Sequence, residues 1–213
     1  DILRFMTNHC YRASIELARE KGTFPLFNRE AYLEGEFVKR LDDDVLEGIA
    51  RHGIRNSHLT SIAPTGTISF CADNISSGIE PVFSYSQERD LITPNGRETV
   101  EIQDFGFARL GVRGKTCEHV TIDEHLGVLS TAQTWVDSAV SKTCNVSPSM
   151  PWQDFKDTYI KAWQLGCKGI TTFNPGGKRF GILRDAEANT EAMPDEKGAT
   201  CTLDPVTGRS ECE

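Results

Sequence analysis

The chain has 213 residues, of which 38% are hydrophobic and 25% charged, enough for one domain or two small ones with a buried core. Its 31 acidic residues outnumber the 23 basic ones, which gives a formal charge of -8 and a pI near 5.2. This balance argues against direct binding to nucleic acid or to an anionic membrane. No apolar run approaches the roughly 20 residues that cross a bilayer, and no signal peptide is visible, so we expect a cytoplasmic protein without a membrane partner.

Two helices are predicted near the N-terminus. Apolar residues recur at helical spacing over residues 2–21, and Gly22 marks the end of this helix. The second helix, residues 43–52, begins with acidic residues and ends before Gly53. The apolar positions are Ile2, Phe5, Met6, Cys10, Ala13 and Leu17 in the first helix, and Val45, Leu46 and Ile49, expected to face inward, in the second.

The rest of the chain alternates between strand and helix patterns. A strand, an amphipathic helix and a strand within about 35 residues form a βαβ unit, which predicts a partly parallel sheet and the α/β class. The predicted elements are a strand over 82–92 and one over 99–102 joined by the turn Asn95-Gly96, a helix over 123–134, a strand over 139–146, a helix over 151–165 with Trp152, Phe155, Tyr159 and Trp163 on one face, and a strand over 168–173.

Residues 185–213 differ in composition from the rest of the chain, because they hold eight acids, two bases and no aromatic residue. Such a segment cannot bury enough apolar surface to offset the entropy of ordering it, so we predict a flexible acidic tail after a folded part over 1–184. Cys201 and Cys212 lie on this tail, where two exposed thiols can form and exchange a disulfide. The turn-like residues 204–208 would bring them together. The alternative is two incidental thiols on a disordered end.

One segment has the character of a phosphate-binding loop. A predicted strand over 58–63 ends in a Pro-Thr-Gly turn, and residues 67–72 are predicted as the first turns of a helix. Unpaired N–H groups at a helix start, with hydroxyls beside them, suit phosphate. The Gly-Lys-Ser/Thr ending of a Walker loop is absent, which argues against Mg-nucleotide hydrolysis. The alternative is a tight turn capped by Thr67. The candidate residues are Ala63, Pro64, Thr65, Gly66, Thr67, Ile68 and Ser69.

The remaining cysteines and histidines give weaker signals. Cys117 lies beside His119, so a thiol–imidazole pair is conceivable there, although adjacent side chains seldom converge. An odd number of cysteines without paired spacing argues against a disulfide scaffold and a metal site. The cysteines expected to be small buried hydrophobic residues are Cys10, Cys71, Cys144 and Cys167, and the histidines without ligand-like spacing are His52, His58 and His125.

Several motifs together resemble the large subunits of ribonucleotide reductases. The run NSHLTSIAPTGTISFCADNISSGIEPVF over 56–83 resembles the substrate-phosphate segment of that family, and AREKGTFPLF over 18–27 resembles the segment upstream of it. VDSAVSKTCNV over 136–146 and DFKDTYIKAWQLGCKGITTF over 154–173 resemble the last strands of the family's fold. The motifs occur in the family's order and cover essentially the whole chain.

This resemblance implies the C-terminal part of a ten-stranded α/β barrel, and replacement of the ribose 2′-hydroxyl by hydrogen through a cysteine thiyl radical. Pro64 to Ser69 would then hold the phosphates of a ribonucleoside di- or triphosphate. Cys201 and Cys212 would be the pair that re-reduces the active-site disulfide, with thioredoxin or a glutaredoxin-type protein as reductant. The parent enzyme is expected to be a homodimer.

The resemblance also implies a class of reductase. Iron- or manganese-dependent members deliver the radical through a tyrosine pair on the last strand, where this chain has Thr171 and Thr172, which cannot be oxidised at accessible potentials. The glycyl-radical loop of anaerobic members is not found around Gly208. The adenosylcobalamin-dependent class remains, whose cofactor breaks its own cobalt–carbon bond, and no corrin contact is assigned in this chain.

The chain departs from the family at one essential point. The family's radical cysteine, in an Asn-x-Cys-x-Glu loop, and two further cysteines precede the matched region. Residues 8–12 have the first half of that pattern, but Arg12 stands where Glu is required. We therefore expect a fragment that is inactive alone and needs the upstream part of the same enzyme, which carries the radical cysteine. Two alternatives are a thiol oxidoreductase using Cys201 and Cys212, and a stand-alone module that binds nucleotide phosphates.

Overall fold

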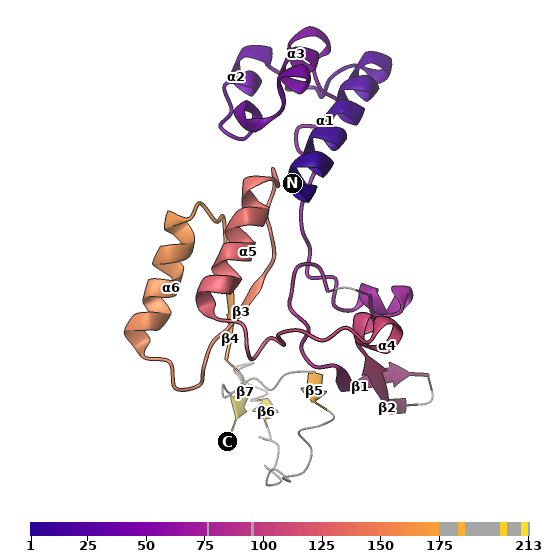
Figure 1. Ribbon diagram of the computed structural model, residues 1–213, viewed down its shortest axis with the longest axis vertical. Coiled ribbons are helices and arrows are strands. Elements are labelled where there is room, and N and C mark those ends of the chain that lie inside the picture. The colour runs from indigo at the N-terminus through magenta and orange to yellow at the C-terminus, as the bar shows by residue number, and fades with distance from the viewer. Residues whose placement is uncertain (76, 95, 175–182, 186–200, 204–209, 213) are drawn as a thin grey trace.

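The computed structural model describes residues 1–213 except 76, 95, 175–182, 186–200, 204–209 and 213. Figure 1 shows the N-terminal helices grouped at one end, a pair of helices with short parallel strands, and a β-hairpin beside a small helix. Among the described residues, no helix combines the length and the apolar character needed to span a membrane.

The N-terminal region is a cluster of helices with its own apolar core. The predicted helices are observed as α1 (Ile2–Lys21) and α3 (Asp43–His52). Two short helices between them were not predicted, α2 (Arg29–Leu33) and the 3-10 helix η1 (Val38–Arg40), and the Asn28 side chain caps α2. The buried core residues are Tyr11, Ile15, Val38, Leu41, Val45, Ile49 and Ile54.

The inward face predicted for α3 is confirmed, and the apolar positions that indicated α1 lie largely on its exposed side. In α3, Val45 and Ile49 are fully buried. In α1, polar side chains occupy the buried face because they find partners there, as when the amide oxygen of Asn8 accepts from the N–H of Asp42 at 2.8 Å. Spacing of apolar residues alone does not reveal such partners. The exposed residues of α1 include Ile2, Phe5, Met6 and Leu17, whereas the buried ones are Thr7, Asn8, Tyr11, Ser14, Ile15 and Ala18.

The predicted hairpin is confirmed. Strands β1 (Ser86–Thr93) and β2 (Gly96–Gln103) pair antiparallel along their whole length, and β1 begins later than the predicted start at residue 82. The other edge of β1 pairs with β5 (Leu183–Asp185). The helix α4 (Phe105–Leu110), which was not predicted, follows β2 and is capped by the Asp104 side chain.

The predicted βαβ unit is confirmed as β3 (Thr143–Asn145), α6 (Trp152–Gln164) and β4 (Thr171–Phe173), with the two strands parallel. Its strands are shorter than predicted. The helix α5 (Ile122–Thr134) precedes the unit, and Figure 1 shows it beside α6. This arrangement confirms the α/β class. The buried core residues are Leu126, Leu129, Ala132, Val136, Val140, Cys144 and Ala162.

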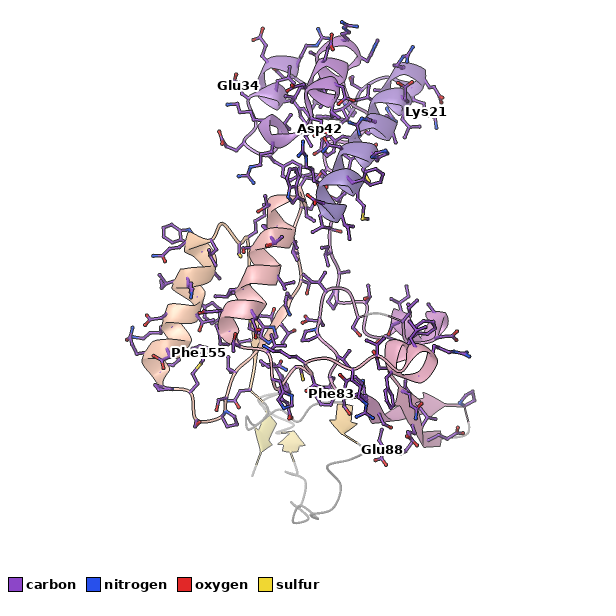
Figure 2. All side chains as sticks on the ribbon, in the orientation of Figure 1. Lys21, Glu34, Asp42, Phe83, Glu88 and Phe155 are labelled. Carbon is purple, nitrogen blue, oxygen red and sulfur yellow. The ribbon has the colours of Figure 1, made fainter. Side chains whose placement is uncertain are left out.

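The aromatic residues of α6 share a face, as predicted, and that face is largely exposed. Trp152 stacks on Phe155 with ring centroids 5.4 Å apart, and Phe155 contacts Tyr159 with centroids 5.3 Å apart. Figure 2 shows Phe155 on this helix. Trp152 and Trp163 are 70% and 74% exposed. The side of α6 that is buried presents small residues instead, Thr158 and Ala162.

Two short strands lie within the predicted tail. Strands β6 (Cys201–Leu203) and β7 (Ser210–Cys212) pair antiparallel, with Cys201 opposite Cys212. The other residues after 185 lie outside the described part of the chain. The division into a folded part over 1–184 and a flexible tail over 185–213 therefore stays a prediction, and Asp185 pairs with Gln87 in the sheet of the hairpin.

Candidate functional site

The 63–69 loop, for which the sequence predicts phosphate binding, starts from a point fixed to the chain that continues into β3. The N–H of Ile62 donates to the carbonyl of Ala139 at 3.1 Å, and the N–H of Ser141 donates to the carbonyl of Ile62 at 2.8 Å. Ile62 and Val140 form a parallel bridge, which is what remains of the strand predicted over 58–63. The backbone pairing defines where the loop begins.

The loop closes on itself. Thr65 has a φ of +50°, and its carbonyl accepts from the N–H of Ser69 at 3.0 Å. The hydroxyl of Ser69, which is 4% exposed, donates to the carbonyl of Gly66 at 2.8 Å and lies 3.3 Å from Oδ1 of Asn74. Ser69 therefore holds the shape of the loop, and its predicted contact with phosphate stays a prediction.

The loop contains three successive candidate hydrogen-bond donors. In the described part of the chain, no hydrogen bond uses the N–H groups of Gly66, Thr67 or Ile68. Thr67 and Ile68 are exposed, and a Cβ placed on Gly66 would meet nothing within 4 Å. The helix that follows is the 3-10 helix η2 (Ile68–Ala72), so its dipole contributes less than that of a longer α-helix. Successive free N–H groups, with the hydroxyls of Thr65 and Thr67 nearby in sequence, suit phosphate oxygens.

A buried ion pair lies behind the loop, and sequence reasoning missed it. Gly78 has a φ of +70°, and a Cβ there would lie 2.7 Å from the carbonyl oxygen of Ala63. Two residues later, the carboxylate of Glu80 lies 2.9 Å from Nζ of Lys142, whose side chain is 2% exposed. Glu80 also accepts from the N–H of Thr143. The one sequence signal was a lysine inside the apolar strand pattern of residues 139–146.

His125 is buried beside this pair. It is 1% exposed, and neither of its ring nitrogens has a hydrogen-bond partner among the described residues. Burial lowers the pKa of His125, the charge of Lys142 lowers it further, and Glu80 and Glu124 act in the opposite direction. The folded protein therefore favours the neutral imidazole.

Asp137 ties the N-terminal helices to the segment that leads into the 63–69 loop. Its carboxylate accepts from the hydroxyl of Tyr11 at 2.9 Å and from the N–H groups of Leu59 and Thr60 at 2.7 and 2.9 Å. The Thr60 hydroxyl lies 3.2 Å away. Asp137 is 7% exposed, so its carboxylate is largely shielded from water and depends on these donors.

The conceivable thiol–imidazole pair does not form. The ring of His119 lies 2.8 Å from the hydroxyl of Thr116, and the Cys117 thiol lies 3.6 Å from the carbonyl of Phe83, a residue labelled in Figure 2. Burial, followed by the charge of Glu118, raises the pKa of Cys117 to about 11. Cys117 therefore stays a thiol at neutral pH and is a poor nucleophile.

Cys144 and Cys167 are also poor nucleophiles, whereas Cys10 is half-buried. Burial raises the pKa of Cys144 to about 11 and raises that of Cys167. Cys71 is exposed, so the expectation that it is buried was wrong. Among the described residues, no group of three or more His, Cys, Asp or Glu side chains could hold a metal ion.

Residues 8–12, rejected as a radical-cysteine loop, have structural roles in the helix cluster. Arg12 lies 2.8 Å from the carboxylate of Asp44 and 3.2 Å from that of Asp42, and Figure 2 shows Asp42 among these helices. Asn8 also binds the N–H of Asp42. The residues around Cys10 thus connect α1 to the start of α3.

The threonine pair and the tail cysteines lie on strands. Thr172 is on β4, and its hydroxyl lies 2.9 Å from that of Tyr159 on α6. Directly opposed residues of an antiparallel pair have Cα atoms about 4.5–5.5 Å apart, a separation that a disulfide can span. The register of Cys201 and Cys212 is therefore compatible with a disulfide between them.

The family to which this fold and loop belong is shown by a comparison of sequences. The sequence pattern described as "Ribonucleotide reductase, barrel domain" matches residues 1–104 and 115–173, most of the chain. The chain belongs to this family, and its helices and strands form part of an α/β barrel.

Individual relatives agree with this assignment. The chain is 32% identical over 225 residues to the "Vitamin B12-dependent ribonucleoside-diphosphate reductase" of Thermoplasma acidophilum, covering 92% of this chain and 27% of that protein. A protein of the same name from Mycobacterium tuberculosis is 29% identical over 238 residues, covering 94% of this chain and 31% of that protein. The chain thus spans about a quarter to a third of the length of these relatives.

A solved structure shares the fold. The class Id ribonucleotide reductase alpha subunit of Actinobacillus ureae superposes with a TM-score of 0.54 at 19% identity. The match covers 81% of this chain and 33% of that subunit.

Proposed function

We propose that this chain is the C-terminal part of the catalytic barrel of an adenosylcobalamin-dependent ribonucleotide reductase, which converts ribonucleotides to 2′-deoxyribonucleotides for DNA synthesis. The family membership supports the reaction. The names of the relatives and the threonines at positions 171 and 172 support the cobalamin class. The observation that carries this chain's own part in the reaction is the row of N–H groups from Gly66 to Ile68, which have no partner among the described residues.

The 63–69 loop would hold the substrate's phosphates. The N–H groups of Gly66, Thr67 and Ile68 would donate to phosphate oxygens, and the hydroxyls of Thr65 and Thr67 would add neutral hydrogen bonds. Because the loop starts from a fixed bridge, a phosphate bound there would orient the ribose. The radical cysteine that acts on the ribose would come from the upstream part of the same enzyme.

Adenosylcobalamin supplies the radical when bound, by breaking its cobalt–carbon bond. In the described ranges, no side-chain cluster could serve as a set of metal ligands, and we assign no residue to the corrin. The chain's own contribution is to bind and orient the substrate.

The tail would supply reducing equivalents. The thiols of Cys201 and Cys212 would attack the active-site disulfide by exchange, so that two electrons and two protons pass to it and the tail pair becomes a disulfide. Thioredoxin or a glutaredoxin-type protein would then reduce the tail. The antiparallel register of the two cysteines supports this role, because it is the register of a closable pair.

The reaction is tested by assaying the full-length enzyme anaerobically for reduction of CDP and CTP with a dithiol, with and without adenosylcobalamin. We expect turnover only with the cofactor, and the preferred substrate identifies the phosphate chain that fits the loop. Tight nucleotide binding without any turnover would favour the stand-alone binding module. Turnover that requires a separate metal-radical subunit would refute the cobalamin class.

The tail is tested by Cys201→Ser and Cys212→Ser in the same enzyme. Each variant should lose turnover driven by thioredoxin and keep turnover driven by a small dithiol that enters the site directly. Cys71→Ser, at an exposed cysteine outside the tail, is the control. Loss of both activities in the tail variants would contradict a shuttle role.

A further inference from the structure

Glu80 and Lys142 form a largely buried ion pair, and both charged groups also form hydrogen bonds with the backbone of Thr143. The side chains are 19% and 2% exposed, and Nζ of Lys142 lies 2.9 Å from Oε2 of Glu80. Nζ also donates to the carbonyl of Thr143 at 3.2 Å, while Oε1 of Glu80 accepts from the N–H of Thr143. Burying two charges costs desolvation energy that their attraction offsets only in good geometry, so such a pair is weak evidence of a stabilising role.

The pair fixes a segment that lies against the 63–69 loop. Glu80 closes a turn in which its N–H donates to the carbonyl of Ser77 at 3.3 Å, and Gly78 lies inside that turn. A Cβ on Gly78 would approach the carbonyl oxygen of Ala63 to 2.7 Å and Oγ1 of Thr65 to 3.7 Å. The turn is therefore in close contact with the inner side of the loop, and the Glu80 carboxylate anchors it to Lys142.

Lys142 belongs to the same stretch of chain that fixes the start of the loop. The bridge partner Val140 and the hydrogen-bonded Ser141 precede it directly, and its own carbonyl accepts from the N–H of Thr171 at 3.4 Å. Backbone pairing thus fixes the start of the loop. The Ser77–Glu80 turn, which the Glu80 carboxylate anchors to Lys142, contacts the loop at Ala63. Both attachments lead to the stretch of chain just before β3, residues 139–142.

The side chain of Lys142 cannot contact a substrate phosphate directly. It is 2% exposed, and its ammonium group already donates to Glu80 and Thr143. The donors without a partner among the described residues are the N–H groups of Gly66, Thr67 and Ile68.

We propose that Glu80 and Lys142 are positioning residues for substrate phosphate binding: their buried ion pair holds the Ser77–Glu80 turn against Ala63 and Thr65. The row of free N–H groups then keeps the spacing that a phosphate needs. This inference rests on the proposed function of the 63–69 loop. It predicts that loss of the pair weakens nucleotide binding and leaves the chemical step intact.

The test uses the full-length enzyme, with KM and kcat measured separately for its nucleotide substrate. Lys142→Met and Glu80→Gln should raise KM on the order of tenfold and change kcat by less than about twofold, the pattern of a loss of uniform binding. The double variant should be no worse than the worse single variant, because the two residues act as one unit. Lys161→Met, which removes the exposed ion pair with Asp123, is the matched control and should change neither constant.

A second variant keeps the test decisive if the pair variants fail to fold. Gly78→Ala leaves both charges in place, pushes on the carbonyl of Ala63, and should raise KM in the same way. An unchanged KM in folded Lys142→Met or in Gly78→Ala, or a fall in kcat alone, overturns the proposal. Amide exchange of residues 65–69 separates the two levels of inference, because exchange that stays unaltered at saturating substrate contradicts phosphate binding by the loop itself, whereas an unchanged KM in Thr67→Val contradicts only a contact by the Thr67 hydroxyl.

Discussion

Charged side chains have different roles in two regions of the chain. One region is the helix cluster formed by α1–α3. The other, here called the barrel segment, is the 63–69 loop together with Glu80, His125, Asp137 and Lys142. In the cluster, Arg12 and Asp44 pair across α1 and α3 with side chains 36% and 62% exposed. In the barrel segment, Lys142 and Glu80 pair with side chains 2% and 19% exposed. Exposed pairs are screened by solvent and contribute little, whereas a buried pair is costly to break. The difference indicates that the charged side chains of the barrel segment hold neighbouring segments of backbone in place, whereas those of the helix cluster lie at the surface.

The two regions also differ in which polar side chains they bury. Around the loop, Ser69, His125, Asp137 and Lys142 are all buried, and three of them have hydrogen-bond partners that hold backbone segments. The helix cluster buries the neutral polar side chains of Thr7, Asn8 and Ser14 beside its apolar core, and no charged side chain is buried among its described residues. Buried polar contacts fix the geometry of a core, and a core that depends on them tolerates substitution less well. We therefore expect substitutions in the barrel segment to have larger effects than matched substitutions among the helices.

The largest effect is expected at Asp137. Asp137→Ala leaves the buried Tyr11 hydroxyl and the N–H groups of Leu59 and Thr60 without their acceptor. A buried donor without a partner costs about 1–3 kcal/mol and the half-buried N–H groups add less, so unfolding of the full-length enzyme should become easier by about 3 kcal/mol. Thermal or urea denaturation measures this. Asp44→Ala, at an exposed carboxylate of the helix cluster, is the control, and equal losses in the two variants would remove the contrast between the regions.

A smaller effect is expected on substrate binding at Thr67. Thr67→Val removes one exposed hydroxyl and keeps the shape of the side chain, so nucleotide affinity should fall by about 1 kcal/mol, the worth of an ordinary hydrogen bond. Equilibrium binding to the full-length enzyme measures this loss. Thr131→Val, at an exposed threonine of α5, should leave affinity unchanged. An affinity loss of the same size in both variants would show that the hydroxyl of Thr67 is not a specific contact.

The smallest effect is a dependence of stability on pH that comes from His125. Because burial lowers the pKa of folded His125, the unfolded chain binds a proton that the folded chain does not as pH falls through about 6.5. Stability should therefore rise with pH through that window and be lost below it. His125→Gln should flatten this part of the profile, measured as melting temperature from about pH 5 to about pH 7.5. An unchanged slope would place the proton uptake elsewhere.

Local signals in the sequence predicted much of the fold. The helix over 43–52, the hairpin of β1 and β2 and the βαβ unit are all confirmed, because apolar spacing and turn residues act within a few positions, although Asn95 of the predicted turn lies outside the described residues. The short helices α2 and α4 were missed, although Asn28 and Asp104 cap them, because five or six residues are too few to establish a period.

The candidate site was predictable only in part. The 63–69 loop could be found from its turn residues and hydroxyls, which are contiguous. The Glu80–Lys142 pair joins residues 62 positions apart, so no local pattern links them. The close approach of Gly78 to Ala63 likewise depends on how two segments pack, and a glycine in sequence does not tell what its missing side chain would meet.

Hydrogen exchange of backbone amides in the full-length enzyme tests the central claim most directly, because it reports on the N–H groups of the loop themselves. Addition of a nucleoside di- or triphosphate substrate should slow exchange in residues 65–69 and leave exchange in the helix cluster over 43–53 unchanged. Protection elsewhere in the enzyme, with exchange in residues 65–69 unaltered at saturating substrate, would contradict phosphate binding by this loop.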